Sequence, residues 1–245
     1  VSSIGFKDPR TEEGELICES RHGREEVEED RSVKGRDFET QYNQNPQPEE
    51  GLMFKRAWFK VVDVLPVKGR VATARFWDCA ATESKPGKDP DFTVGTKLSK
   101  FEDGTFYVED VVRGRWSPHV VDETIAKTAQ LDGQKVKIRE EQEPGASGKS
   151  VIAIHTRMLA GYDYAGRAPS GAKTTRWRPV AVQAEAGNVV LLRGEWNQAW
   201  MQEITTVPDA KHDDQADSVA GAFEEVVFGR RKARLAMVRE GDRPR

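Results

Sequence analysis

The sequence predicts an α/β fold in which a mixed β-sheet carries helices on its faces. Residues 70–78 form a mostly apolar run, consistent with a strand that is buried on both faces. Two further β-type runs, 92–98 and 105–112, are joined across Asp103-Gly104, a strong hairpin turn signal. The segments that follow alternate between strand and helix patterns. Hairpins followed by a β-α-β-α order predict a mixed sheet.

The first helix is expected to begin at Ser117-Pro118 and to end at Gly133. Serine is a good N-cap, proline suits the first helical position, and glycine ends helices. A strand over 135–142 and a helix over 148–161 follow, each with apolar residues at the appropriate spacing.

The rest of the chain alternates more loosely. Residues 162–187, rich in Gly, Ser, Lys and Arg, are expected to be irregular, and 188–192 to form a short strand. A short helix over 196–204 should end before Pro208. The last helix, 213–228, places its apolar residues on one face with 3.6-residue periodicity.

Composition indicates one compact domain with peripheral segments. Of the 245 residues, 32% are charged, and the mean hydropathy is −0.70. Residues 1–50 are expected to form a separate charged segment and linker, with a polar, proline-containing connector at 43–51. The compact domain is expected over 51–229. The absence of an initiator Met suggests an excised fragment.

The basic tail 230–245 carries seven Arg or Lys against two acids and is expected to be flexible. Two interpretations of it stay open, a solvated end or a contact with DNA or a partner.

Several classes of protein are disfavoured. No stretch reaches the roughly 18 to 20 apolar residues of a membrane span, and the N-terminus lacks the apolar core of a signal peptide. Cys18 and Cys79 lie in unlike contexts, which favours reduced thiols in a cytosolic protein. The net charge of −3 argues against a DNA-coating protein. It leaves room for a nuclease whose acids are clustered.

Acidic residues at element ends are the candidate functional groups. Asp78 ends the run 70–78, and Glu143 follows the strand 135–142, with Glu141 as a fallback for the same role. The last helix opens with Asp213, Asp214 and Asp217. Carboxylates from two strand ends and a helix start can converge on one or two divalent cations, which phosphodiester hydrolysis needs. The pattern therefore predicts a metal-dependent nuclease.

Structural interpretations compete with each of these assignments. Asp78 could be a turn residue, and acids at a helix start commonly offset the helix dipole. Asp91 either supports Asp78 or only begins a strand, while His212 is either a base beside the metal or a surface residue. The loop cations Lys173, Arg176 and Arg178 either contact phosphates or are solvated.

The segment Gly145 to Ser150 resembles the end of a phosphate-binding loop. That loop pattern requires a glycine five residues before Gly148, where this chain has Glu143. A glutamate there would repel phosphates. A nucleotide-hydrolysing P-loop protein is therefore disfavoured.

Four motifs in order resemble the C-terminal nuclease domain of tailed-phage (bacteriophage) terminase large subunits. They are Phe-Trp-Asp-Cys-Ala-Ala-Thr, Gln-Glu-Pro-Gly-Ala-Ser-Gly-Lys, Glu-Ala-Gly-Asn-Val and His-Asp-Asp-Gln-Ala-Asp-Ser, at 76–82, 142–149, 185–189 and 212–218. Residues 35–46 are similar to the segment that links the terminase motor to its nuclease. The resemblance covers roughly 32–228.

The resemblance implies an RNase H-like fold, a mixed β-sheet flanked by helices on both faces. It implies an endonuclease that cuts concatemeric viral DNA during genome packaging, with little sequence specificity and two Mg²⁺ or Mn²⁺ ions. Asp78 would be the first-strand acid, Glu143 the second acid, often Asp in relatives, and Asp214 or Asp217 the helix acid. Asp213 and Asp91 are further candidate metal ligands.

The same resemblance implies partners and context. Residues 1–50 would then come from the end of a missing ATPase motor domain. The partners would be double-stranded DNA, the terminase small subunit and the portal protein, with no membrane, in the host cytoplasm. The isolated domain is expected to be monomeric. The alternative function is a non-catalytic module that docks to the portal.

Overall fold

The computed structural model divides the chain into two units, Val1–Gly51 and Leu52–Arg245. The structure describes residues 23, 24, 27, 53–80 and 89–241, and of these the side chains up to position 229. The expected linker 43–51 lies outside the described residues, as does nearly all of the expected segment 1–50. No helix in the described part of the chain combines the length and apolarity that a membrane span requires.

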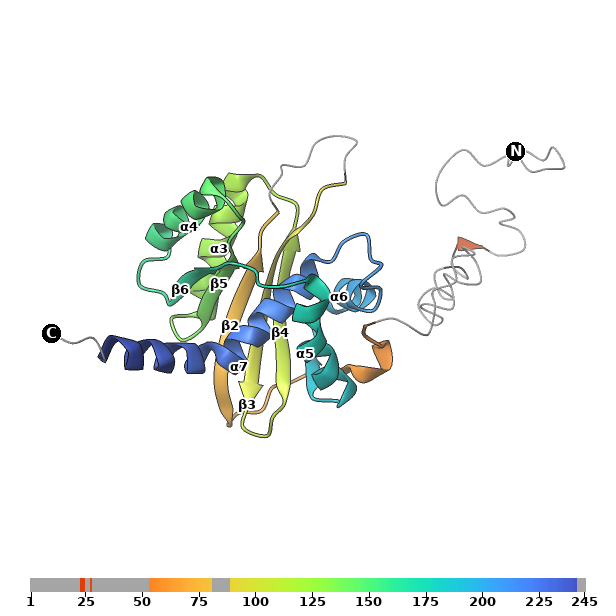
Figure 1. Ribbon diagram of the computed structural model, residues 1–245. Helices are drawn as coiled ribbons and strands as arrows, with labels where there is room; N and C mark the ends of the chain where they lie inside the picture. Colours follow the sequence, from red (N-terminus) through yellow and green to blue (C-terminus); the bar gives the residue numbers. More distant parts are fainter. Residues whose placement is uncertain (1–22, 25–26, 28–52, 81–88, 242–245) are drawn as a thin grey trace. The chain divides into compact units, whose positions relative to one another are not determined.

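The second unit is built on a mixed seven-stranded sheet, as predicted (Figure 1). In the described residues the strand order is β1-β7-β4-β3-β2-β5-β6. Strands β2, β3 and β4 form an antiparallel meander, whereas β5 and β6 continue the sheet in parallel beyond β2, and β7 and β1 do so beyond β4. The strands are Lys60–Val62 (β1), Arg70–Asp78 (β2), Thr93–Phe101 (β3), Phe106–Gly114 (β4), Lys137–Glu141 (β5), Tyr164–Arg167 (β6) and Val189–Leu192 (β7).

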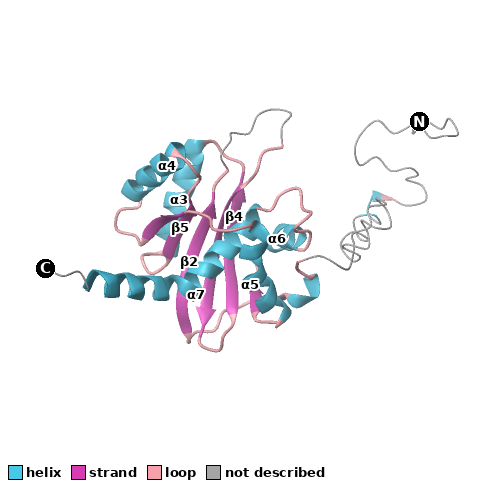
Figure 2. Ribbon diagram, in the orientation of Figure 1, coloured by secondary structure: helices cyan, strands magenta, loops and turns pink. Residues whose placement is uncertain are grey.

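Helices cover both faces of this sheet (Figure 2). After the short 3₁₀ turn η1 (Arg56–Trp58) they are α3 (Pro118–Asp132), α4 (Ala146–Met158), α5 (Lys173–Glu185), α6 (Asn197–Ile204) and α7 (Asp214–Gly241). Neighbouring side chains of a strand point to opposite faces, and β2 shows this at its end. Phe76 belongs to the larger apolar core with α5, α6 and α7, and Trp77 to a smaller core with α3.

The helix α7 is fixed to the sheet by a buried hydroxyl and a glycine. Ser218 Oγ donates a hydrogen bond to the Phe76 carbonyl oxygen (2.8 Å) and accepts one from the Thr96 amide (3.0 Å). A Cβ added at Gly221 would lie 2.5 Å from the Phe76 ring, so only glycine permits this close approach. The two contacts set where the first turn of α7 lies relative to the end of β2.

The prediction that 162–187 is irregular was wrong, because this region contains β6 and α5. Within α5, Trp177, Val180, Ala181 and Ala184 form a buried stripe with helical spacing. Pro179 lies inside the helix and polar residues surround the stripe, so local propensity hides the pattern. Packing against the core stabilises the helix instead.

The helix α7 also runs beyond its predicted end at 228 and continues through Gly241. The backbone of 230–241, expected as part of a flexible tail, is therefore helical, and 242–245 lie outside the described residues.

A buried histidine connects β5 to both helices on the α3 side. His155 on α4 lies 2.6 Å from Glu140 Oε2 through Nδ1 and 2.9 Å from Asp122 Oδ1 through Nε2. Tyr164 OH donates to the same Glu140 oxygen at 2.7 Å. Burial alone would lower the pKa of His155, but the two carboxylates raise it to about 8.

Replacing Ser218 with Ala should lower the free energy of unfolding by about 1–3 kcal/mol, because it leaves two buried backbone groups without a partner. Urea denaturation measures the effect. Ser150→Ala is the control, because the exposed Ser150 hydroxyl bonds only its own helix, and it should change stability by less than about 0.5 kcal/mol. Equal effects of the two changes would contradict this role of Ser218.

The folded protein holds the His155 proton more tightly than the unfolded chain, whose histidine has an ordinary pKa of 6.5. The stability that this proton contributes is therefore fully present below pH 6.5 and lost as the pH rises through about 8. We expect the free energy of unfolding to fall across this window, and to fall less in His155→Gln. Parallel pH profiles for the two proteins would disprove the assignment.

Candidate metal centre and active site

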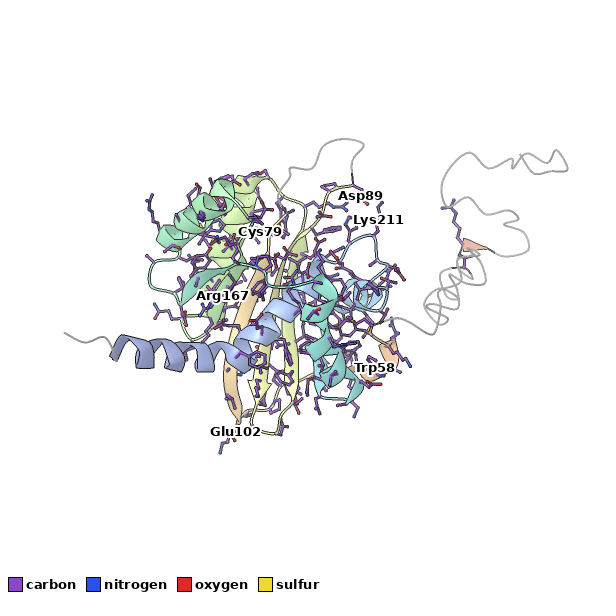
Figure 3. The ribbon with its side chains drawn as sticks, in the orientation of Figure 1. Trp58, Cys79, Asp89, Glu102, Arg167 and Lys211 are labelled. Atoms are coloured by element: carbon purple, nitrogen blue, oxygen red, sulfur yellow. The ribbon has the colours of Figure 1, made fainter. Side chains whose placement is uncertain are left out.

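Two carboxylates lie at the same edge of the sheet because their strands are parallel neighbours. Asp78 is the last residue of β2, and Glu141 is the last residue of β5. Trp77 pairs with Glu140, so Asp78 and Glu141 are the next positions along the two strands. Alternation turns both side chains away from the α3 side and toward α7. In Figure 3 the label of Cys79 marks this edge, opposite Glu102 at the far end of the meander.

The first turn of α7 adds two buried acids to this edge. Asp214 Oδ2 accepts a hydrogen bond from the Phe92 amide (3.0 Å), and Asp217 Oδ1 accepts one from Trp177 Nε1 (2.8 Å). Both carboxylates are buried, with 7% and 2% of each residue exposed. Their orientations are therefore set by the backbone just before β3 and by a side chain of α5.

Burial and neighbouring negative charges make two of these acids harder to ionise. Burial raises the pKa of Asp78 well above its ordinary value, and the negative charges of Glu141, Asp217 and Asp214 raise it further. Burial also raises the pKa of Asp214, although the Phe92 amide partly opposes this. Buried carboxylates that lie this close to one another are stabilised by any positive charge placed among them.

Two cations from α5 supply positive charge to these acids. Lys173 Nζ lies 2.8 Å from Asp213 Oδ1 and 2.9 Å from Asp217 Oδ2. Arg176 lies 2.7 Å from Glu141 Oε2 and 3.0 Å from Asp217 Oδ1. Two of the three residues expected to contact DNA are thus bound to the acids. The third, Arg178, is exposed on the same helix.

The structure brings Glu141, the fallback of the sequence analysis, into this cluster. Its charge is the largest electrostatic contribution to the raised pKa of Asp78. Glu143 lies beyond the end of β5, is exposed, and lines a cavity of about 250 Å³ together with residues of α3 and α4. The Pro144-Gly145 turn favoured Glu143 in the sequence, whereas the end of β5 at Glu141 is what distinguishes the two, because alternation puts both residues on the same face.

The phosphate-loop resemblance at Gly145 to Ser150 has a structural explanation. A Cβ at Gly148 would lie 2.1 Å from the carbonyl oxygen of Glu143, so Gly148 serves a tight backbone turn. The chain itself fills the space over this glycine. Lys149 is exposed at the start of α4.

A second group of possible metal ligands shares Asp214. Ligand atoms of Asp91, His212 and Asp214 all lie within 4.8 Å of one another. His212 Nδ1 is 3.4 Å from Asp91 Oδ1, and its Nε2 is 3.0 Å from Asp89 Oδ2. Asp89 also pairs with Lys211, and Figure 3 labels these two residues beside each other. His212 is therefore part of the acidic edge rather than an isolated surface residue.

The donors at this edge fit a divalent cation of the magnesium class. Such ions take oxygen ligands, chiefly carboxylates, and manganese also accepts imidazole. Four carboxylates from β2, β5 and α7 converge, and the ammonium and guanidinium groups already bound there show that these oxygens take cationic partners. A divalent cation would supply two positive charges on one atom, in place of the single charge of a lysine or an arginine side chain.

Comparison with known proteins agrees with this architecture. The family model of the terminase RNaseH-like domain matches residues 75–225, a range that includes all four converging acids. No curated protein sequence matches the chain. Among solved structures, mutant gp2c of the large terminase subunit from bacteriophage Sf6 with calcium is 11% identical, with a TM-score of 0.51, covering 70% of this chain and 98% of that one.

Two further structures are similar at a lower score. The large terminase nuclease from thermophilic phage G20c is 14% identical, with a TM-score of 0.48, covering 71% of this chain and 97% of that one. The human cytomegalovirus terminase nuclease domain, soaked in manganese with an inhibitor bound, is 11% identical, with a TM-score of 0.47, covering 63% and 82%. The family match spans more than half of the 245 residues and the Sf6 structure shares the fold, so this chain belongs to the terminase RNaseH-like domain family.

Proposed function

We propose that this chain is a metal-dependent endonuclease that cuts concatemeric viral DNA during genome packaging, as the nuclease part of a terminase large subunit. The observation that carries the proposal is the convergence of Asp78, Glu141, Asp214 and Asp217 at one edge of the sheet. The pKa of Asp78 is raised by burial and by the charges of the other three acids, so gathering them costs folding stability, and structural roles alone do not account for the cluster.

In this proposal the four carboxylates hold two Mg²⁺ or Mn²⁺ ions. Ions in such a site lower the pKa of an attacking water and stabilise the leaving oxygen of the phosphodiester. The protein itself orients the carboxylates that would bind these ions. The Phe92 amide and the Trp177 indole each fix one oxygen of a carboxylate, which presents the rest of Asp214 and Asp217 in a set direction. Asp91 and His212 would support Asp214 from the side.

The DNA would bind across this edge through its backbone. Lys173 on α5 is an exposed cation that contacts the acids, and Arg178 is exposed on the same helix. Phosphate contacts carry no direct sequence information. We therefore expect little cut-site preference and a strong dependence of DNA affinity on salt. The wider context belongs to the same proposal: residues 1–50 would connect to an ATPase motor, and the small subunit and portal would act on the full-length protein in the host cell.

Supercoiled plasmid should be cut in the presence of Mn²⁺ and left intact with EDTA. Asp78→Ala should lose at least about 100-fold of the activity, because even the outer partners of metal ligands typically contribute 10–100-fold. Glu102→Gln, at the opposite end of the sheet, is the control and should cut like the wild type. If Asp78→Ala cuts at the wild-type rate, or if neither the wild type nor the variants cut the plasmid, the non-catalytic docking module is favoured.

The identity of the second acid can be tested with a matched pair of neutral substitutions. Glu141→Gln should reduce cleavage by about 100-fold or more, whereas Glu143→Gln should stay within a few-fold of the wild type, because the charge of Glu141 acts on Asp78 most strongly. Initial rates of plasmid nicking measure both. If Glu143→Gln reduces cleavage more than Glu141→Gln does, Glu143 is the second acid of the site.

A further inference from the structure

Arg176 holds two of the proposed metal ligands at once. Its Nη1 lies 2.7 Å from Glu141 Oε2, and its Nη2 lies 3.0 Å from Asp217 Oδ1. The guanidinium therefore connects the end of β5 to the first turn of α7. The contact is largely shielded from solvent, since the exposed fractions of the three side chains are 15%, 20% and 3%.

A divalent cation bound by Glu141 and Asp217 would compete directly with this arginine. The guanidinium donates to Glu141 Oε2 and to Asp217 Oδ1, so its positive charge lies between two carboxylates that the proposed metal would coordinate. One positive charge on Arg176 is also a weaker match for the converging acids than a divalent ion. We propose that Arg176 is a placeholder counterion, which holds Glu141 and Asp217 in the metal-free protein and leaves them when the metal binds. The inference rests on the proposed metal site.

Two features of the surroundings favour a displaceable arginine. Its buried Nε has no hydrogen-bond partner among the described residues, so the guanidinium is incompletely satisfied in this position. Arg176 also lines a cavity of about 200 Å³, together with Arg167, Ser170 and the acids Glu224 and Glu225. This cavity adjoins Glu141 and gives the side chain space after it leaves.

Lys173 is a different case, although it also contacts Asp217. Its side chain is 52% exposed, so water and salt screen its attraction for Asp213 and Asp217. Arg176 is the more enclosed cation, and its removal should change metal affinity more. Arg178, exposed on the same helix, offers a control with the same change of charge.

The test is calorimetric titration of Mn²⁺ into the metal-free chain, in the wild type, Arg176→Gln, Arg176→Lys and Arg178→Gln. Because a charge-assisted hydrogen bond must be broken before the metal binds, Arg176→Gln should bind Mn²⁺ roughly 10-fold more tightly than the wild type. Arg176→Lys should lie between them, since lysine keeps the charge and loses the two-oxygen geometry. Arg178→Gln should bind Mn²⁺ like the wild type.

Thermal unfolding supplies an independent readout that does not depend on catalysis. Without metal, Arg176→Gln should have a lower Tm than the wild type, because the half-buried Glu141 loses its ion pair and the buried Asp217 loses one of its two cations. Saturating Mn²⁺ should remove most of this difference. If Arg176→Gln does not fold without metal, the Mn²⁺ affinity of Arg176→Lys decides the question.

The outcomes separate this inference from the proposed function. Mn²⁺ binding by the wild type with equal or weaker binding by Arg176→Gln would overturn the placeholder role alone and make Arg176 a structural or substrate-contacting residue. Failure of the wild type and every variant to bind Mn²⁺ would instead remove the metal site, and the inference with it.

Discussion

Concentrated negative charge at one edge of the sheet is the constraint on which the rest of the structure depends. Asp78, Glu141, Asp214 and Asp217 come from three elements far apart in the sequence, and burial together with the charges of the other three makes ionisation of Asp78 less favourable. Such a cluster persists in a folded protein only when positive charge offsets it and the surrounding packing holds the carboxylates in place. Arg176 and Lys173 supply such charge through their ion pairs with these acids.

The packing is supplied from both faces of the sheet. The larger core lies under α5, α6 and α7, and the smaller one under α3, so β2 is covered on each side just before Asp78. Ser218, one residue beyond Asp217, ties the start of α7 to backbone groups of β2 and β3. The site is therefore mounted on regular elements that are fixed by buried contacts, which gives catalytic groups better-defined positions than loops do.

Sequence patterns located most of this arrangement. Apolar runs and hairpin signals identified β2, β3 and β4, capping residues identified α3, and the family resemblance placed Asp78 and the acids of α7. The sequence patterns did not predict two features correctly. Helix α5 was hidden because Pro179 and many polar residues mask its buried stripe, and its register, which puts Arg176 against Glu141, depends on tertiary packing. The choice between Glu141 and Glu143 depended on where β5 ends, and strand ends are poorly defined by local sequence.

Strand β5 shows how one short segment serves both structure and chemistry. Adjacent residues of a strand point to opposite faces, so Glu140 and Glu141 experience different surroundings. Glu140 is buried on the α3 side, where His155 and Tyr164 satisfy it in a closed network. Glu141 reaches the α7 side, where its partner Arg176 is one that a metal ion could replace. Because Glu140 is held firmly, the backbone that carries Glu141 is fixed even when the cation beside Glu141 changes. Glu140 thus keeps Glu141 in a constant position. A site that exchanges Arg176 for a metal, as proposed above, requires such a fixed ligand.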